Sequence, residues 1–402
     1  MSDLAQVQSG VQKPGRFPGL DNLRAAAILL VMVFHLQGYL PAVLAPIGQI
    51  GWMGVDLFFV LSGFLIGTQL LRPYSDGKRV SIREFYLRRA YRILPAFLLV
   101  LLLYYVLPVW REAPGPTSIW EYLTFTWNLI LSDYPDQRAF SHVWSLCVEE
   151  HFYLVLPALV VWLMRRPKMS KATVTVAAIV AGGIALRAWL LFHVVRQVPA
   201  DDDRAWTLFM RWIYYPTDTR LDGLVAGVAL AAIRIFPPSW FLAKSGWAKV
   251  AGHGTSMLIG GLALVAAALW MFRWDYPNME ETAGIVVGFP VLSAGLGLVV
   301  AAATCNRGVI QIRIPGARGL AILAYSLYLT HKAVAHVDRA IFPWMEQSTS
   351  WLTAGIYALS CLAVAAALYF AVERPFLMLR ARQTLKTRKS AILQEVQTDP
   401  AI

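Results

Sequence analysis

The chain has 402 residues, of which 57% are hydrophobic and only 15% are charged, and its mean hydropathy is +0.53. Ordinary soluble domains are about 45–50% apolar and about 25% charged. This composition excludes a soluble enzyme, a disordered protein, a nucleic-acid-binding domain and a disulfide scaffold, and it predicts an all-α polytopic membrane protein. The net charge of +12 is typical of cytoplasmic loops rich in Lys and Arg, so we expect membrane lipids, and no nucleic acid, as partners.

Long apolar runs dominate the chain, and runs of about 20 residues predict membrane-spanning helices. Ten such spans are expected, at residues 22–40, 50–71, 93–109, 148–164, 172–194, 213–235, 250–272, 284–304, 320–343 and 351–372. The segment at residues 119–131 is too short and too aromatic to span, so we expect it to lie at the interface or to re-enter the membrane.

The loop charges predict the orientation of these spans. Most of the 36 Lys and Arg residues lie in alternate loops, which places both termini in the cytoplasm and requires an even number of spans. We therefore expect a cytoplasmic tail at residues 1–16, one membrane domain at residues 17–377, and a basic, disordered cytoplasmic tail at residues 378–402. The three cysteines have unrelated spacings and predict neither a disulfide framework nor a metal site.

The first predicted span carries Arg24 and His35, eleven residues apart. At about 100° per residue they share one helix face and lie about 16 Å apart along the axis. A cation at the cytoplasmic mouth and a titratable base deeper in the membrane could therefore line one channel. Alternatively, Arg24 reaches lipid phosphate and His35 bonds a neighbouring carbonyl.

The second span contains Asp56, an acid within an apolar run. Burying a carboxylate is expensive, so we expect Asp56 to face the bundle interior, paired with His35 or with an arginine. The following Ser62 and Gly63 are more simply explained by close helix packing than by chemistry.

Two further motifs carry charge at the predicted membrane ends. Arg89 and Arg92 share a helix face, and their guanidinium groups suit an anionic cytosolic ligand. The general enrichment of Lys and Arg in cytoplasmic loops explains them equally well. Glu149 and Glu150 open the fourth span after Trp144, and their side chains point about 100° apart. One of them could assist acid–base chemistry, although carboxylates also favour a helix N-terminus.

Together these motifs resemble the membrane-bound acyltransferase-3 family of integral-membrane acyltransferases. The motifs occur in the family's order and extend over roughly residues 17–377, at residues 20–28 with His35, 54–64, 89–95, 144–153, 220–223, 325–331 and 373–375. The departures are small: Cys147 and His151 stand where the family more often has serine and glutamine, and Asn22 replaces a common glycine.

The resemblance implies transfer of an acyl group, most often acetyl, from cytosolic acyl-CoA to a hydroxyl of a carbohydrate or lipid-linked glycan. Because guanidinium groups match phosphate oxygens, we expect Arg24, Arg89 and Arg92 to bind the phosphates of acyl-CoA at the cytoplasmic mouth. A bacterial inner membrane is the expected location. Because Glu149 and Glu150 open a span at the outer side, we expect the acceptor on that face.

The expected mechanism uses His35 as general base on the acceptor hydroxyl, since imidazole titrates near neutral pH. Either Glu150 or Asp56 would orient its ring, with Glu149 as a further catalytic carboxylate, and an acyl-histidine intermediate is an alternative. The expected substrate-binding residues are Trp144, Asp222 and His331.

Two other functions compete with this hypothesis. Some members of the family acylate small molecules such as macrolides. A proton-coupled transporter would instead use the intramembrane Asp and His residues as a relay, although no inverted repeat supports that interpretation.

Overall fold

The computed structural model describes residues 17–130, 138–199, 202–236, 253–277, 279–305 and 311–383. The predicted tail at residues 1–16 and most of the predicted C-terminal tail, residues 384–402, lie outside these residues. Within the described part, the long helices are α2 (Pro18–Leu36), α4 (Met53–Ser75), α5 (Ile82–Val106), α7 (Trp144–Arg165), α8 (Met169–His193), α10 (Asp222–Ile235), α12 (Gly254–Met271), α13 (Phe289–Ala303), α14 (Ala317–Ile341) and α15 (Trp351–Leu368). Shorter helices are α3 (Ala45–Ile50), α6 (Ile119–Leu123) and α9 (Asp203–Phe209).

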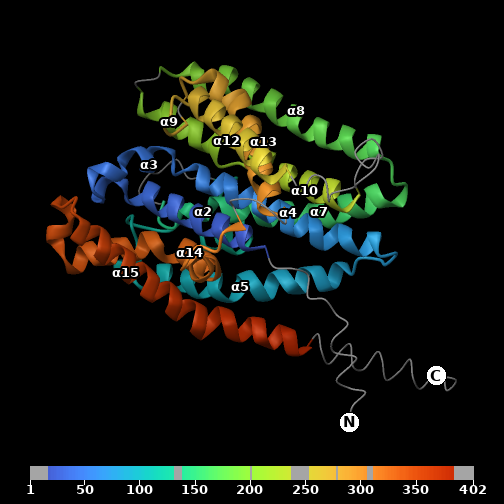
Figure 1. The fold of residues 1–402 in the computed structure, drawn as a ribbon. Helices are drawn as coiled ribbons and strands as arrows, with labels where there is room; N and C mark the ends of the chain where they lie inside the picture. Colours follow the sequence, from blue (N-terminus) through green and yellow to red (C-terminus); the bar gives the residue numbers. More distant parts are fainter. Residues whose placement is uncertain are drawn as a thin grey trace, which may run out of the picture.

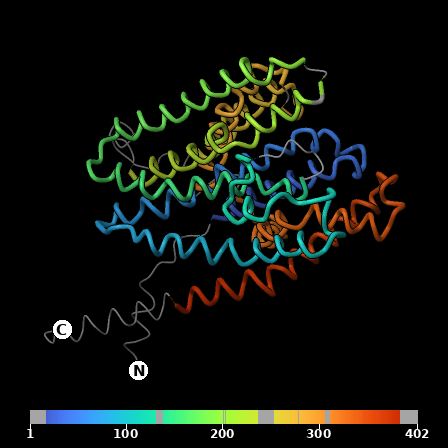
Figure 2. Tube along the Cα trace, turned by 180° about the vertical axis from the view of Figure 1, so that it is seen from behind, coloured from blue at the N-terminus to red at the C-terminus, as the bar shows by residue number. Residues whose placement is uncertain are grey.

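These long helices lie side by side in one bundle (Figure 1). Helices α8 and α15 lie on opposite sides of it in both views (Figure 2). Helices α2, α4 and α10 lie between these sides, and α4 packs closely against both α2 and α10. The all-α polytopic class expected from the sequence is confirmed.

Eight helical segments of the described chain are long and apolar enough to cross a membrane, and they correspond to eight of the ten predicted spans. The other two predicted spans correspond to α10 and α14. Helix α14 has 25 residues but buries polar side chains, among them Ser326, Thr330 and His331. Its polarity therefore reflects burial against other helices instead of contact with lipid.

The span predicted at residues 213–235 is interrupted. A π-helical turn at Met210–Tyr214 ends before α10 begins at Asp222, and the residues between them are not helical. Side chains form hydrogen bonds with the backbone groups that the interruption leaves without helical partners. Asn128 donates to the Tyr215 carbonyl at 3.1 Å, and Arg187 donates to the Thr219 carbonyl at 2.6 Å. Such irregular backbone is tolerated in a membrane protein where protein buries it.

The predicted interfacial segment, residues 119–131, forms the short helix α6 and then turns. Tyr122 and Trp127 are fully buried, and Tyr122 donates to the Ala139 carbonyl at 2.8 Å. Two aromatic side chains of this segment therefore fix it to the protein, while Trp120 and Ile130 stay exposed.

The last span extends beyond its predicted end. A π-helical turn at Tyr369–Glu373 follows α15, and the chain stays helical through Gln383, past the boundary of residue 377 expected for the membrane domain. This turn brings Glu373 into the bundle, where it is 1% exposed.

Candidate active site

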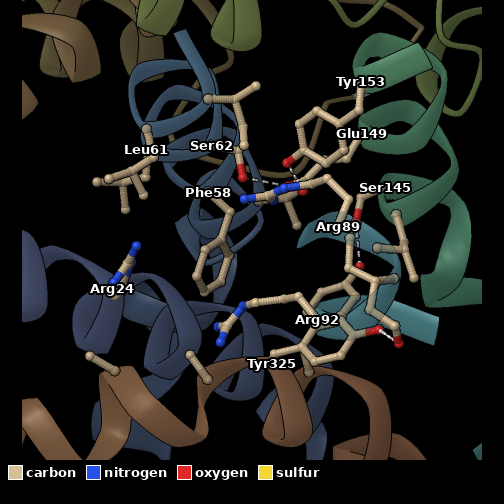
Figure 3. A pocket seen from close by; sticks show the side chains of 18 residues that line it. Arg24, Phe58, Leu61, Ser62, Arg89, Arg92, Ser145, Glu149, Tyr153 and Tyr325 are labelled. Atoms are coloured by element: carbon tan, nitrogen blue, oxygen red, sulfur yellow. Dashed lines mark hydrogen bonds between the residues drawn. The ribbon is translucent and has the colours of Figure 1, made fainter. Parts of the chain in front are cut away.

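A cavity of about 310 Å³ opens between α2, α4, α5, α7 and α14, and we call it the arginine cavity. Arg24, Arg89 and Arg92 all line it. Figure 3 shows Arg24 on the side opposite Arg89 and Arg92. The structure therefore brings together the three arginines that the sequence suggested for an anionic ligand.

Arg92 and Arg89 contact neighbouring side chains of the cavity wall. Arg92 forms an ion pair with Glu373 at 3.0 Å, and Ser326 donates to the other Glu373 oxygen at 3.1 Å. The guanidinium of Arg89 lies 5.1 Å from the centre of the Tyr153 ring, and no described residue accepts a hydrogen bond from its buried Nε. Arg89 therefore keeps hydrogen-bonding capacity inside the cavity wall.

The two adjacent glutamates separate, as their spacing predicted. Glu149 lines the arginine cavity, where it accepts hydrogen bonds from Tyr153 at 2.5 Å and Ser62 at 3.2 Å (Figure 3). Glu150 does not line it, and its buried Oε1 has no hydrogen-bond partner among the described residues. Glu149 therefore shares a cavity with the arginines, and its position does not by itself support an acceptor site on the outer face.

A second cavity, of about 70 Å³, adjoins the first, and we call it the histidine cavity. Val55 and Tyr328 line both cavities. His35 lines the histidine cavity, and so do aromatic side chains that include Trp52 and Trp144. The three arginines and His35 therefore line two adjacent cavities that share Val55 and Tyr328.

The partners of His35 differ from those predicted. Its Nδ1 lies 3.0 Å from the Val31 carbonyl oxygen and 3.1 Å from Nε2 of His331. The expectation that Glu150 or Asp56 orients this ring is wrong. Asp56 instead accepts a hydrogen bond from Arg220 at 2.8 Å, so the arginine alternative for its partner is correct.

Two buried ion pairs brace the interrupted segment before α10. Arg220 pairs with Asp56 and is covered by the Phe289 ring, 4.2 Å from its guanidinium. Arg187 pairs with Asp222 at 2.7 Å. Each acid therefore has a buried basic partner, and neither acid lines either cavity.

The predicted substrate-binding residues differ in whether they line a cavity. Trp144 lines the histidine cavity as expected. Asp222 and His331 line neither cavity. Asp222 is paired with Arg187, and His331 is fully buried behind His35. The predicted contact of these two residues with substrate does not agree with their positions.

The structure adds a polar group that sequence reasoning missed. His142 also lines the histidine cavity, and its ring centre lies 5.1 Å from that of His331. Its Nδ1 is 4.0 Å from Glu112, which binds Lys332 at 3.1 Å. The available signal was the position of His142, two residues before Trp144 and its motif.

Tyr276, which lines the histidine cavity from outside the membrane-spanning helices, remains a neutral hydroxyl group. Burial, together with the neighbouring Tyr214 and Tyr215, raises the pKa of Tyr276 well above its ordinary value. Tyr276 stacks on Phe34 with ring centres 5.2 Å apart. The cavity wall is therefore aromatic and uncharged on this side, whereas the arginine cavity is cationic.

The bundle and its two cavities define an integral membrane protein with a titratable site buried between its helices. Residues 17–370 match the acyltransferase-3 family, described as an acyltransferase domain, and the chain belongs to this family. The family expected from the sequence motifs is thereby confirmed.

Curated relatives agree with this assignment. The O-acetyltransferase OatA of Staphylococcus aureus (strain NCTC 8325 / PS 47) is 28% identical over 343 residues, covering 79% of this chain and 50% of the relative. A protein of strain COL, whose name gives a provisional O-acetyltransferase assignment, is 29% identical over 332 residues with the same coverage. The chain spans about half the length of these relatives. No solved structure matches the chain.

Proposed function

We propose that this protein transfers an acyl group, most simply acetyl, from cytosolic acyl-CoA to a hydroxyl of a carbohydrate or glycan acceptor. The observation that carries the proposal is the adjacency of the arginine cavity and the histidine cavity across Val55 and Tyr328. The relatives' O-acetyltransferase names support the same reaction class.

The arginine cavity suits the donor. Coenzyme A carries phosphate groups at one end and its thioester at the other, and guanidinium groups bind phosphate oxygens well. With both termini in the cytoplasm, Arg24, Arg89 and Arg92 would hold the phosphates near the cytoplasmic end. The pantetheine arm would then extend past Val55 and Tyr328 toward His35.

The histidine cavity suits the chemical step. His35 would remove the proton from the acceptor hydroxyl as its oxygen attacks the thioester carbonyl carbon. The new C–O bond forms, the C–S bond breaks, and the departing thiolate takes the proton from His35, which regenerates the base. A volume of about 70 Å³ favours a short acyl group such as acetyl.

A proton-coupled transporter is less well supported. Asp56 and Asp222, two acids of the suggested relay, are each fixed by a buried arginine. The family is also one of acyltransferases. We place the enzyme in a bacterial inner membrane, because the relatives are bacterial proteins.

The test uses the purified full chain in detergent with radiolabelled acetyl-CoA, in the presence and absence of an envelope-glycan extract. We expect glycan-dependent release of free thiol by the wild type and at least a ~100-fold loss in His35→Ala, because general-base catalysis contributes about 10²–10⁴-fold. His193→Ala is the matched control, since His193 is exposed on α8 and also bonds a carbonyl four residues earlier.

Undiminished turnover in His35→Ala would overturn the assignment of the base. Failure of the folded wild type to bind acetyl-CoA would overturn the donor. In a parallel reaction with a macrolide in place of the extract, label transferred to the macrolide but to no glycan would support acyl transfer and replace the proposed acceptor.

A further inference from the structure

His331 of α14 lies directly behind His35 of α2. Nε2 of His331 is 3.1 Å from Nδ1 of His35, and the ring centres are 4.9 Å apart. His331 is fully buried and lines neither cavity. His331 therefore does not contact substrate directly, and the cavity-lining side chain that the structure places within hydrogen-bond distance of it is His35.

The surrounding carbonyl groups determine where the protons lie on both rings. Nδ1 of His331 is 3.1 Å from the Leu327 carbonyl oxygen and 3.0 Å from that of Tyr328. Carbonyl oxygens only accept hydrogen bonds, so Nδ1 of His331 carries a proton. In neutral His331, Nε2 then has a free lone pair and accepts.

The same reasoning applies to His35. Its Nδ1 lies between the Val31 carbonyl oxygen at 3.0 Å and the lone pair on Nε2 of His331. Both neighbours are acceptors, so Nδ1 of His35 carries the proton and donates to them. Nε2 of His35, which has no partner among the described residues, is then left unprotonated.

The opposite assignment is unfavourable. If His331 donated to His35 instead, its ring would carry two N–H groups and a positive charge. The lone pair on Nδ1 of His35 would then face the Val31 carbonyl oxygen at 3.0 Å. The charged ring would also be fully buried, with the ring of His142 centred 5.1 Å away, and burying such a charge without a carboxylate hydrogen-bonded to it is costly.

We infer that His331 is a positioning residue: it holds His35 in the tautomer protonated on Nδ1, with the basic Nε2 free for the acceptor hydroxyl. This inference rests on the proposed function for its chemical meaning. When His35 takes the hydroxyl proton, both ring nitrogens carry hydrogen. Its bond to His331 then becomes charge-assisted and therefore stronger.

His331 keeps its own proton throughout this cycle. The proton that His35 acquires on Nε2 passes to the departing thiolate, and Nδ1 of His35 never exchanges its hydrogen. Because the His331 bond strengthens only as charge develops on His35, it lowers the barrier more than it stabilises the bound donor. Its loss should therefore reduce kcat and leave the KM for acyl-CoA nearly unchanged.

The kinetic test compares His331→Leu, which cannot accept a hydrogen bond, with His331→Gln, whose amide oxygen can. We expect kcat to fall roughly 10- to 100-fold in His331→Leu, the range for one lost charge-assisted bond, with partial recovery in His331→Gln. On a His35→Ala background, His331→Leu should have no further effect, because it acts through the missing ring. Equal losses in both variants, or a further loss on the His35→Ala background, would overturn the inference.

A spectroscopic test does not depend on activity. The chain has seven histidines, so ¹⁵N-histidine labelling of the detergent-solubilised protein, with His35→Ala and His331→Gln for assignment, can identify the protonated nitrogen of each ring. We expect His35 and His331 each to be protonated on Nδ1. A His35 ring protonated on Nε2 would refute the inference even if acyl transfer is confirmed, and the expected tautomers in a protein that does not consume acyl-CoA would refute only the proposed function.

Discussion

Helices α4 and α10 approach so closely at Gly63 that adding one methyl group there should push the two helices apart. A Cβ added to Gly63 would meet the Leu224 carbonyl group, with its carbon at 2.9 Å and the Leu224 Cα at 3.0 Å. Ordinary contacts at such positions are 3.4–4 Å. All of these atoms belong to the backbone of α10, so no side-chain rotation can relieve the clash.

The substitution Gly63→Ala must therefore move one helix by more than a few tenths of an ångström. Overpacking of this kind costs about 1–3 kcal/mol, and the gap opened along the rest of the interface forfeits further dispersion energy. Alanine returns about 1 kcal/mol of helix propensity. We expect a net loss of about 2 kcal/mol in the free energy of unfolding, and reduced turnover because Val55 and Ser62 of α4 line the cavities.

The three cysteines provide the assay, since all are buried thiols outside any disulfide and become reactive toward a thiol dye as the protein unfolds on heating. Gly297→Ala on α13 is the control, because nothing lies within 4 Å of a Cβ added there. We expect Gly63→Ala to expose its cysteines at a lower temperature than the wild type at the same scan rate, and Gly297→Ala not to. Identical unfolding of Gly63→Ala and the wild type, with equal turnover, would refute this account of the α4–α10 contact.

Two other substitutions test the charged groups. Asp56→Asn leaves Arg220 buried without its counter-ion, which should lower the free energy of unfolding by about 3–5 kcal/mol. The double variant with Arg220→Met should regain part of this stability in the same thiol-dye assay. A double variant no more stable than Asp56→Asn would contradict a simple ion pair. Arg89→Gln should weaken acetyl-CoA binding roughly 10- to 100-fold in an equilibrium binding measurement, the effect of one lost charged hydrogen bond. Arg83→Gln, an exposed arginine on the same helix, should bind like the wild type, and equal affinities for all three proteins would remove Arg89 from the donor site.

The sequence could predict the bundle because its information is local. Runs of apolar residues predict helices, and an eleven-residue spacing places Arg24 and His35 on one face, where each lines one of two adjacent cavities. The same argument places Glu149 and Glu150 on different faces. These predictions need only the helix period.

Partners across the bundle could not be predicted in this way. Asp56 had two candidate partners, and choosing Arg220 requires knowing that α4 packs on the segment before α10. The pairing of His35 with His331 joins residues 296 positions apart, so no local pattern reports it. The sequence could not show that Asp222 forms an ion pair instead of binding substrate, because its partner Arg187 lies on another helix.

The π-helical turns determine where these helices can change length. A π turn closes its hydrogen bonds across one more residue than an α-helical turn, so it holds that extra residue with little change in the direction that the following residues face. Removing one residue within Tyr369–Glu373 should therefore leave Glu373 close to Arg92. Removing one residue from α15 itself would rotate everything beyond it by about 100° and separate this pair. Length changes in homologous chains are thus expected at π turns and in the connections between helices.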